Sequence, residues 1–178
     1  MQDSEPTEDQ NVKQPIVLIG FMAAGKTSIG SLLAKKLNRK FLDLDQEIER
    51  VQGKSIEEIF QTQGEVAFRK IETEVCQTLG EMSNIIISTG GGIINNPNNM
   101  RIFKKHSLVI YLESSFEQIY GRLKKSKKIR PLFQKHSKEE LLDLYRKRHP
   151  IYTQHADISI QTINSKKEIL DQIINLIN

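Results

Sequence analysis

Short apolar runs alternate with longer amphipathic segments along most of this chain. The apolar runs predict five strands, at residues 15–19, 40–45, 85–88, 108–112 and 157–160. Between them, apolar residues recur every three or four positions, which predicts amphipathic helices. Strands separated by helices are typical of an α/β fold in which helices cover both faces of a parallel sheet.

The helical segments also indicate where they begin and break. Residues 46–83 are helical in pattern but interrupted near Gly53 and Gly64. Ser55, followed three residues later by Glu58, forms the capping-box pattern of a helix N-terminus. The last helix is predicted from about residue 166 to residue 177.

Composition and charge narrow the class of protein. At 178 residues, with no repeat or linker, the chain is expected to form a single domain at 15–178 after a disordered polar tail at 1–14. The net charge of +4 is mild and no basic stripe is interleaved with aromatic residues, so a nucleic-acid partner is not expected. No segment approaches the ~20 apolar residues of a membrane span. The single cysteine, Cys76, excludes an internal disulfide and is expected to be a packing residue in a cytoplasmic protein.

Residues 20–27, GFMAAGKT, carry the strongest chemical signal. They fit the pattern G-x-x-x-x-G-K-[ST] of a phosphate-binding P-loop and stand between a predicted strand and a predicted helix, as that motif requires. Gly20 and Gly25 let backbone N–H groups approach phosphate oxygens. Lys26 is expected to reach the β- and γ-phosphates of ATP, and Thr27 to place its hydroxyl on Mg²⁺. The expected ATP-binding residues of this segment are Ala23, Ala24, Gly25, Lys26, Thr27 and Ser28.

Two carboxylates, Asp43 and Asp45, end the second predicted strand. Residues i and i+2 of a strand point to the same side, so both are expected to project toward the phosphates. One would hold metal-bound water, and the other would hydrogen-bond an acceptor hydroxyl and help to receive its proton. The alternative is a pair of helix-capping aspartates, because the residues from Gln46 onward are helical in pattern.

The third predicted strand ends in Ser88 and leads into Gly90-Gly91-Gly92. The acidic strand end of motor and helicase ATPases is therefore missing, and the GTPase patterns N-K-x-D and D-x-x-G do not occur. Three glycines give a loop whose backbone can press against a ligand. The alternative is a flexible connection to residues 95–97.

Arg69, Arg148 and a basic segment complete the candidate set. If both arginines face the carboxyl edge of the sheet, their planar guanidinium groups suit bidentate capture of a carboxylate on the acceptor; otherwise they are ordinary surface residues. The basic run 122–131 predicts a mobile lid around 122–137 that closes over the triphosphate, with a solvated helix end as the alternative. The four histidines show no zinc-ligand spacing.

Together these segments resemble the shikimate kinase family from about Ile16 to Ile160. The matching segments are GFMAAGKT (20–27), FLDLDQEIE (41–49), SIEEIF (55–60), GEVAFRKIE (64–72), STGGG (88–92), RPLF (130–133) and RHPIY (148–152). Each is only suggestive alone, whereas all of them in this order are specific. Ala23 departs from the family pattern, because glycine is common at its position.

The resemblance implies a P-loop NTPase fold of the nucleoside-monophosphate-kinase type, a three-layer sandwich around a five-stranded parallel sheet. It also implies a monomer that transfers the γ-phosphoryl group of Mg²⁺-bound ATP to the 3-hydroxyl of shikimate, in chorismate and aromatic amino-acid biosynthesis. Thr27 resembles the metal ligand, Asp43 a contributor to the metal's water shell, and Arg130 the lid arginine over ATP. The implied catalytic residues are Lys26, Asp45 and Arg130. The implied shikimate-binding residues are Asp45, Arg69, Gly90, Gly91, Gly92 and Arg148.

Two other functions stay open on the residues alone. The first is a kinase with another acceptor, such as gluconate or a nucleotide. Asp45 and the two arginines favour a hydroxylated carboxylic acid over a base-bearing nucleotide. The second is a P-loop protein that binds a nucleotide or a partner without catalysis. Such a protein is expected to have lost Lys26, Asp45 or an arginine, and this chain retains them.

Overall fold

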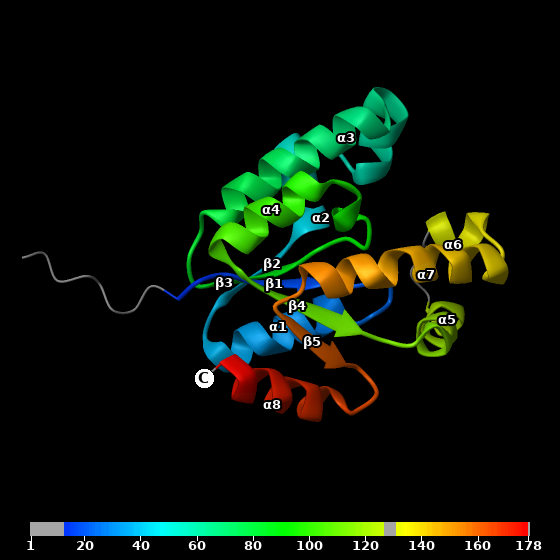
Figure 1. The fold of residues 1–178 in the computed structure, drawn as a ribbon. Helices are drawn as coiled ribbons and strands as arrows, with labels where there is room; N and C mark the ends of the chain where they lie inside the picture. The colour runs from blue at the N-terminus through cyan, green and yellow to red at the C-terminus, as the bar shows by residue number, and fades with distance from the viewer. Residues whose placement is uncertain (1–12, 127–130, 178) are drawn as a thin grey trace, which may run out of the picture.

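The computed structural model describes residues 13–126 and 131–177 of the chain (Figure 1). Most of the predicted tail and the candidate lid arginine Arg130 lie outside the described residues. Lys13 and Gln14 are described, and their backbone carbonyls accept hydrogen bonds from the Asn84 amide and the Arg39 guanidinium. Among the described residues, no helix is long and apolar enough to cross a membrane.

Five parallel strands form one sheet, as the sequence predicts. The strands are β1 Ile16–Ile19, β2 Lys40–Asp43, β3 Ile85–Ser88, β4 Leu108–Glu113 and β5 Ile158–Gln161. They are arranged in the order β2-β3-β1-β4-β5, so β1 is central and pairs with β3 on one side and β4 on the other. The P-loop follows β1 and the triple glycine follows β3, so both emerge at the same edge of the sheet.

Helices cover both faces of this sheet and give the expected three layers (Figure 1). One face is covered by α1 and α8, the other mainly by α2, α3, α4 and α7. The helical segments are α1 Lys26–Leu37, α2 Leu44–Gln52, α3 Ile56–Gly80, the 3₁₀ turn η1 Ile93–Asn95, α4 Pro97–His106, α5 Phe116–Lys125, α6 Pro131–Lys135, α7 Lys138–His155 and α8 Lys166–Ile177.

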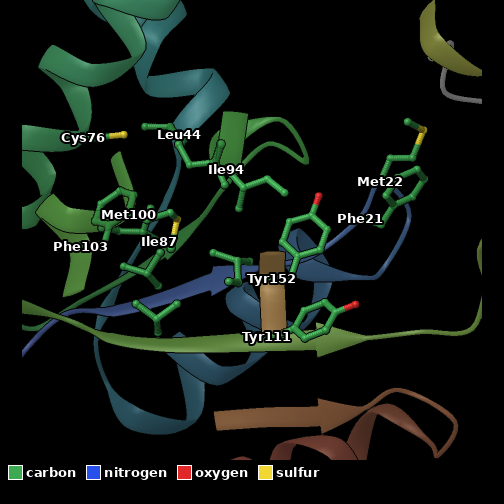
Figure 2. Packing of buried hydrophobic residues seen from close by; sticks show 14 of the residues in the cluster. Phe21, Met22, Leu44, Cys76, Ile87, Ile94, Met100, Phe103, Tyr111 and Tyr152 are labelled. Atoms are coloured by element: carbon green, nitrogen blue, oxygen red, sulfur yellow. The ribbon is translucent and has the colours of Figure 1, made fainter. Parts of the chain in front are cut away.

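The strands divide their side chains between two apolar cores. Val17 and Ile19 of β1 face the core under α3 and α4, whereas Ile16 and Leu18 face α1 and α8. Figure 2 shows part of the first core, in which Cys76 lies among strand and helix side chains. Cys76 has no exposed surface, and burial raises the pKa of its thiol. The predicted packing role of this cysteine is therefore confirmed.

The predicted second strand is wrong at its carboxyl end. It ends at Asp43, and Leu44 begins α2. The Asp43 carboxylate accepts hydrogen bonds from the amides of Asp45 and Gln46, at 3.2 and 3.5 Å, and so acts as the N-cap of α2. The capping interpretation therefore applies to Asp43, and Asp45 belongs to the first helical turn rather than to a strand.

The predicted breaks and cap in the next helical segment are confirmed. Gly53 ends α2 with φ of 62°, and Gly64 interrupts α3 with φ of 81°, both in the region that favours glycine. Ser55 and Glu58 form the capping box, since the Ser55 hydroxyl accepts from the Glu58 amide and the Glu58 carboxylate accepts from the Ser55 amide.

The start of the basic segment is helical. Residues 122–125 form the last turn of α5. The guanidinium of Arg122 donates to the carbonyl of Ala23 in the P-loop at 3.2 Å and to the hydroxyl of Ser114 at 3.1 Å. Arg122 therefore contacts the P-loop, and the lid around 122–137 stays a prediction.

Two helical glycines provide a matched test of the packing between α1 and the sheet. A Cβ at Gly30 would lie 2.7 Å from Phe41 Cε2 and 3.1 Å from Leu18 Cδ1, whereas a Cβ at Gly121 on α5 meets no atom within 4 Å. Gly30→Ala is expected to lower the free energy of unfolding by about 1–3 kcal/mol through overpacking. Gly121→Ala is expected to raise it by about 0.5–1 kcal/mol through helix propensity. Urea denaturation of both variants measures the difference, and stabilisation by Gly30→Ala would contradict the tight contact.

Candidate active site

The P-loop makes a tight turn directly after β1. Gly20 has φ of 147°, and a Cβ there would lie 2.8 Å from the Leu112 carbonyl oxygen, so only glycine fits. Gly25 has φ of 99° and occupies the N-cap of α1, where it offers no side chain to the first amides of the helix. These amides and the helix dipole are suited to bind an anion. Ala23 has φ of 59°, which explains physically why glycine suits this position.

Lys26 is folded over the loop that contains it. Its side chain is 7% exposed, and Nζ donates to the carbonyls of Gly20 and Phe21 at 2.7 and 2.8 Å. The ammonium is therefore held at the centre of the P-loop. A phosphate bound by the loop amides would lie within the field of this charge.

Thr27 lies beside two other side chains that carry oxygen atoms, and the three residues Thr27, Asp43 and Ser88 are called the oxygen corner below. Its hydroxyl donates to Asp43 Oδ2 at 3.0 Å and lies 3.3 Å from the hydroxyl of Ser88. Asp43 and Ser88 are paired in register on β2 and β3, which fixes the geometry of this corner. Among the described residues, no group of three acidic, histidine or cysteine side chains gathers as a self-sufficient metal site. One carboxylate and two hydroxyls suit a hard cation that arrives with phosphate and keeps most of its water.

The triple glycine is packed against three different parts of the site. A Cβ at Gly90 would lie 3.2 Å from Asp45 Oδ1, and one at Gly92 would lie 3.2 Å from Arg69 Nη2. A Cβ at Gly91 would lie 3.2 Å from the Met22 amide of the P-loop. The loop therefore lies close to the P-loop, Asp45 and Arg69, which favours a ligand-facing loop over a flexible connection.

Arg69 reaches this loop from α3. Its Nη1 donates to both oxygens of Glu72, at 3.1 and 3.0 Å, and its Nη2 lies 3.5 Å from Glu65 Oε1. Glu72 is 2% exposed, whereas the side chain of Arg69 is 24% exposed. The guanidinium is thus held by a buried carboxylate through Nη1, while Nη2 pairs with Glu65 and lies close to Gly92 of the loop.

Arg148 approaches the same loop from α7. Its guanidinium carbon lies 5.9 Å from the centre of the Phe21 ring, and its charge acts on the hydroxyl of Tyr152 one turn later. Tyr152 donates to the Gly91 carbonyl at 2.5 Å. Its ring stacks on that of Tyr111, and Figure 2 shows these two rings beside each other. Burial raises the pKa of Tyr152, an effect that Arg148 partly opposes, so the phenol remains a proton donor at neutral pH.

The structure therefore gathers most of the predicted site residues at one edge of the sheet. The contacts above connect the P-loop with Asp45, the triple glycine, Arg69 and Arg148. Asp45 reaches the site from a helical turn and not by the predicted strand periodicity. Arg130 lies outside the described residues, so its position over ATP stays a prediction.

Four residues of the site were missed at the level of sequence. They are Ser88, Glu72, Tyr152 and Arg122. Ser88 was noted only as the absence of an acidic residue, although its place at the end of β3 was the signal that could have identified it. Glu72 lies three residues after Arg69, the spacing of neighbours on a helix face, and Tyr152 lies four after Arg148. Arg122 gave no such signal, because its partners are far away in the chain.

A hollow elsewhere on the molecule has none of these groups. It has a volume of about 360 Å³ and is lined in part by Pro15, Met82 and His106, at the amino edge of the sheet. Because the phosphate loop and both arginines lie at the carboxyl edge, this hollow does not belong to the candidate site.

Comparisons with known proteins show which family the chain resembles. The model of the shikimate kinase family matches residues 22–178. The shikimate kinase of Persephonella marina is 41% identical over 163 residues, which cover 91% of this chain and 98% of that protein. The shikimate kinase of Aquifex aeolicus is 39% identical over 159 residues, which cover 89% of this chain and 93% of that protein.

Solved structures give the same result. The structure of shikimate kinase from Acinetobacter baumannii in complex with shikimate superposes with a TM-score of 0.85 at 38% identity, covering 93% of each chain. The structure of the Aquifex aeolicus enzyme has a TM-score of 0.77 at 36% identity, covering 92% of this chain and 95% of that one. The P-loop NTPase fold implied by the sequence is therefore confirmed.

Proposed function

The chain belongs to the shikimate kinase family, and we propose that it transfers the γ-phosphoryl group of ATP to the 3-hydroxyl of shikimate. The products are shikimate 3-phosphate and ADP, in chorismate and aromatic amino-acid biosynthesis. The observation that carries this assignment is the triple glycine, which contacts the P-loop, Asp45 and Arg69 at once. A phosphate-binding group and an acceptor-binding group thereby share one loop.

The ATP side of the reaction uses the P-loop and the oxygen corner. Backbone amides of residues 23–28 bind the phosphates, and Lys26 neutralises charge on the β- and γ-phosphates. The corner fits Mg²⁺, with Thr27 as a direct ligand and Asp43 holding its water. When bound, this ion would neutralise phosphate charge and hold the triphosphate for in-line transfer.

The acceptor side uses Asp45, two arginines and the triple glycine. Arg69 and Arg148 bind the shikimate carboxylate with their planar guanidinium groups. Asp45, half-buried beside Gly90, accepts a hydrogen bond from the 3-hydroxyl and helps to receive its proton as the oxygen attacks. The backbone of residues 90–92 contacts the ring of the bound shikimate.

Three further expectations stay predictions. They are a lid around 122–137 that closes with Arg130 over ATP, a monomer, and a cytoplasmic location. Closure of such a segment would exclude water from the γ-phosphate.

The acceptor is tested by coupling ADP release to a spectroscopic signal in the presence of Mg²⁺ and ATP. Turnover is expected with shikimate and not with gluconate, AMP or no acceptor, because AMP offers no carboxylate to the two arginines and the flexible gluconate chain does not hold a hydroxyl at a fixed separation from its carboxylate. Turnover with gluconate or AMP alone would keep the kinase class and reject the acceptor assignment. ATP binding without any turnover would favour a non-catalytic protein.

Asp45→Asn tests the group assigned to the acceptor hydroxyl. Turnover is expected to fall roughly 100-fold or more, because an amide accepts a proton poorly. The affinity for ATP is expected to stay within about twofold, since Asp43 and the P-loop are unchanged. Glu57→Gln, an exposed carboxylate in the first turn of α3, is the matched control. Wild-type turnover in Asp45→Asn would remove Asp45 from this role.

Arg148→Ala tests the assignment of the carboxylate-binding arginines. The KM for shikimate is expected to rise about 10- to 100-fold, because charge-assisted hydrogen bonds to the carboxylate are lost, while the KM for ATP changes little. Arg146→Ala is the control on the same helix, because Arg146 is exposed and pairs only loosely with Asp143. Equal changes in the two KM values would contradict the assignment.

A further inference from the structure

A cluster of buried polar side chains lies directly behind Arg69, between α3 and α4. Its centre is formed by Glu72, which is 2% exposed, and Asn99, which has no exposed surface. Burying an ionised carboxylate and an amide away from water is costly unless each polar atom has a partner. The contacts of these two side chains therefore reveal what the cluster maintains.

Glu72 is held from two sides. Arg69 Nη1 donates to both of its carboxylate oxygens, and Asn99 Nδ2 donates to Oε2 at 3.2 Å. The Asn99 amide also lies 3.4 Å from the Ile93 carbonyl, at the start of the turn that follows the triple glycine. Asn99 thus connects Glu72, the carboxylate that holds Arg69, with Ile93, the residue that follows the triple glycine.

The orientation of the Asn99 side chain is set by the acceptors around it. Its oxygen lies 2.7 Å from the hydroxyl of Thr73, which also lies 3.0 Å from the Arg69 carbonyl and accepts from the amide of Asn96 at 2.9 Å. A flipped amide would direct the Asn99 oxygen at the Glu72 carboxylate and the Ile93 carbonyl, which are both acceptors. While Glu72 is ionised, the network therefore favours the orientation in which Asn99 donates to Glu72.

We propose that Asn99 is a positioning residue for the acceptor site, which keeps Glu72 charged and in place so that Glu72 holds Arg69 toward the triple-glycine loop. The proposal rests on the proposed function, because Arg69 is assigned there to the carboxylate of shikimate. Asn99 itself touches neither substrate. It acts through Glu72 on the direction of the guanidinium and through Ile93 on the loop.

Titration of Glu72 makes this role measurable. Burial raises the pKa of Glu72, Arg69 lowers it, the charge of Asp45 on α2 raises it, and the hydrogen bond from Asn99 lowers it. The buried thiol of Cys76 also lies within the field of Glu72, and α4 contributes the neutral amide of Asn99. Removing the Asn99 donor raises the pKa of Glu72 further. The carboxyl is then protonated as the pH falls, and it no longer holds Arg69.

The test compares Asn99→Leu with the wild type and with Asn98→Leu, an exposed asparagine one residue earlier on α4. Shikimate affinity is measured by calorimetry between about pH 6 and pH 9, and ATP affinity is measured in parallel. In Asn99→Leu, shikimate binding is expected to weaken about tenfold near pH 6 and to recover toward the wild-type value as the pH rises. ATP affinity, and both affinities of Asn98→Leu, are expected to stay within about twofold of the wild type.

Two further variants separate positioning from a general loss of packing. Glu72→Gln, which imitates the protonated carboxyl, is expected to weaken shikimate binding at every pH. Asn99→Leu added to it is expected to have no further pH dependence. Thr73→Val keeps the volume near Asn99 but removes the hydroxyl that lies beside its oxygen, and a smaller effect of the same sign is expected should Asn99→Leu unfold.

Three results for Asn99→Leu would overturn the proposal. They are unchanged shikimate affinity, a loss of shikimate affinity that does not depend on pH, and an equal loss of ATP affinity. Thr73→Val with wild-type binding throughout the pH range would also overturn it. The proposed function is judged separately, on shikimate-dependent turnover of the wild type. A failure of that function and a failure of this inference are therefore read from different measurements.

Discussion

The lack of side chains at Gly90, Gly91 and Gly92 is the constraint on which the site depends. Each glycine faces a different neighbour, and a Cβ at each would lie 3.2 Å from an atom of that neighbour. Protein interiors are too closely packed to absorb three such atoms in one short loop without moving what surrounds them. The loop therefore sets the separation between the phosphate-binding segment, Asp45 and Arg69, although it contributes no functional side chain itself.

The rest of the site is arranged around this loop in two halves. Lys26 and the oxygen corner form a phosphate half, which is positioned by β1 and by the paired ends of β2 and β3. Arg69 on α3 and Arg148 on α7 form the proposed acceptor half. Tyr152 connects the halves, because its buried ring packs in the core while its hydroxyl holds the carbonyl of Gly91. Positioning of this kind accounts for most of catalysis in phosphoryl transfer, where the protein does little covalent chemistry.

The strands and the P-loop were predictable from the sequence, because these depend on local pattern. The apolar runs of β1 and β3 and the capping box of Ser55 are each readable within a few residues. The placement of Asp45 was mispredicted, because strand periodicity and an aspartate N-cap fit the same local sequence. In the structure the Asp43 carboxylate accepts from the amides of Asp45 and Gln46, and the helix begins at Leu44. Ser88 and Glu72 were missed although their place at the end of β3 and the i+3 spacing from Arg69 were local signals. Arg122 was missed for a different reason, because its partner Ala23 is brought close only by the tertiary fold.

The ion pair between Arg69 and Glu72 shows a compromise between the affinity for an acceptor and the orientation of the arginine. A carboxylate as buried as Glu72 adds little net stability, because its desolvation cancels most of its attraction to the guanidinium. It also neutralises part of the charge that Arg69 could offer a substrate. Without Glu72, however, the guanidinium would sample many rotamers, and the entropy of fixing it would oppose acceptor binding. Because α3 is broken at Gly64, shortly before Arg69, the backbone alone does not guarantee the direction of this side chain. Glu72, with its second donor Asn99, therefore weakens the electrostatic attraction between Arg69 and an acceptor carboxylate. It also keeps Arg69 oriented before the acceptor binds.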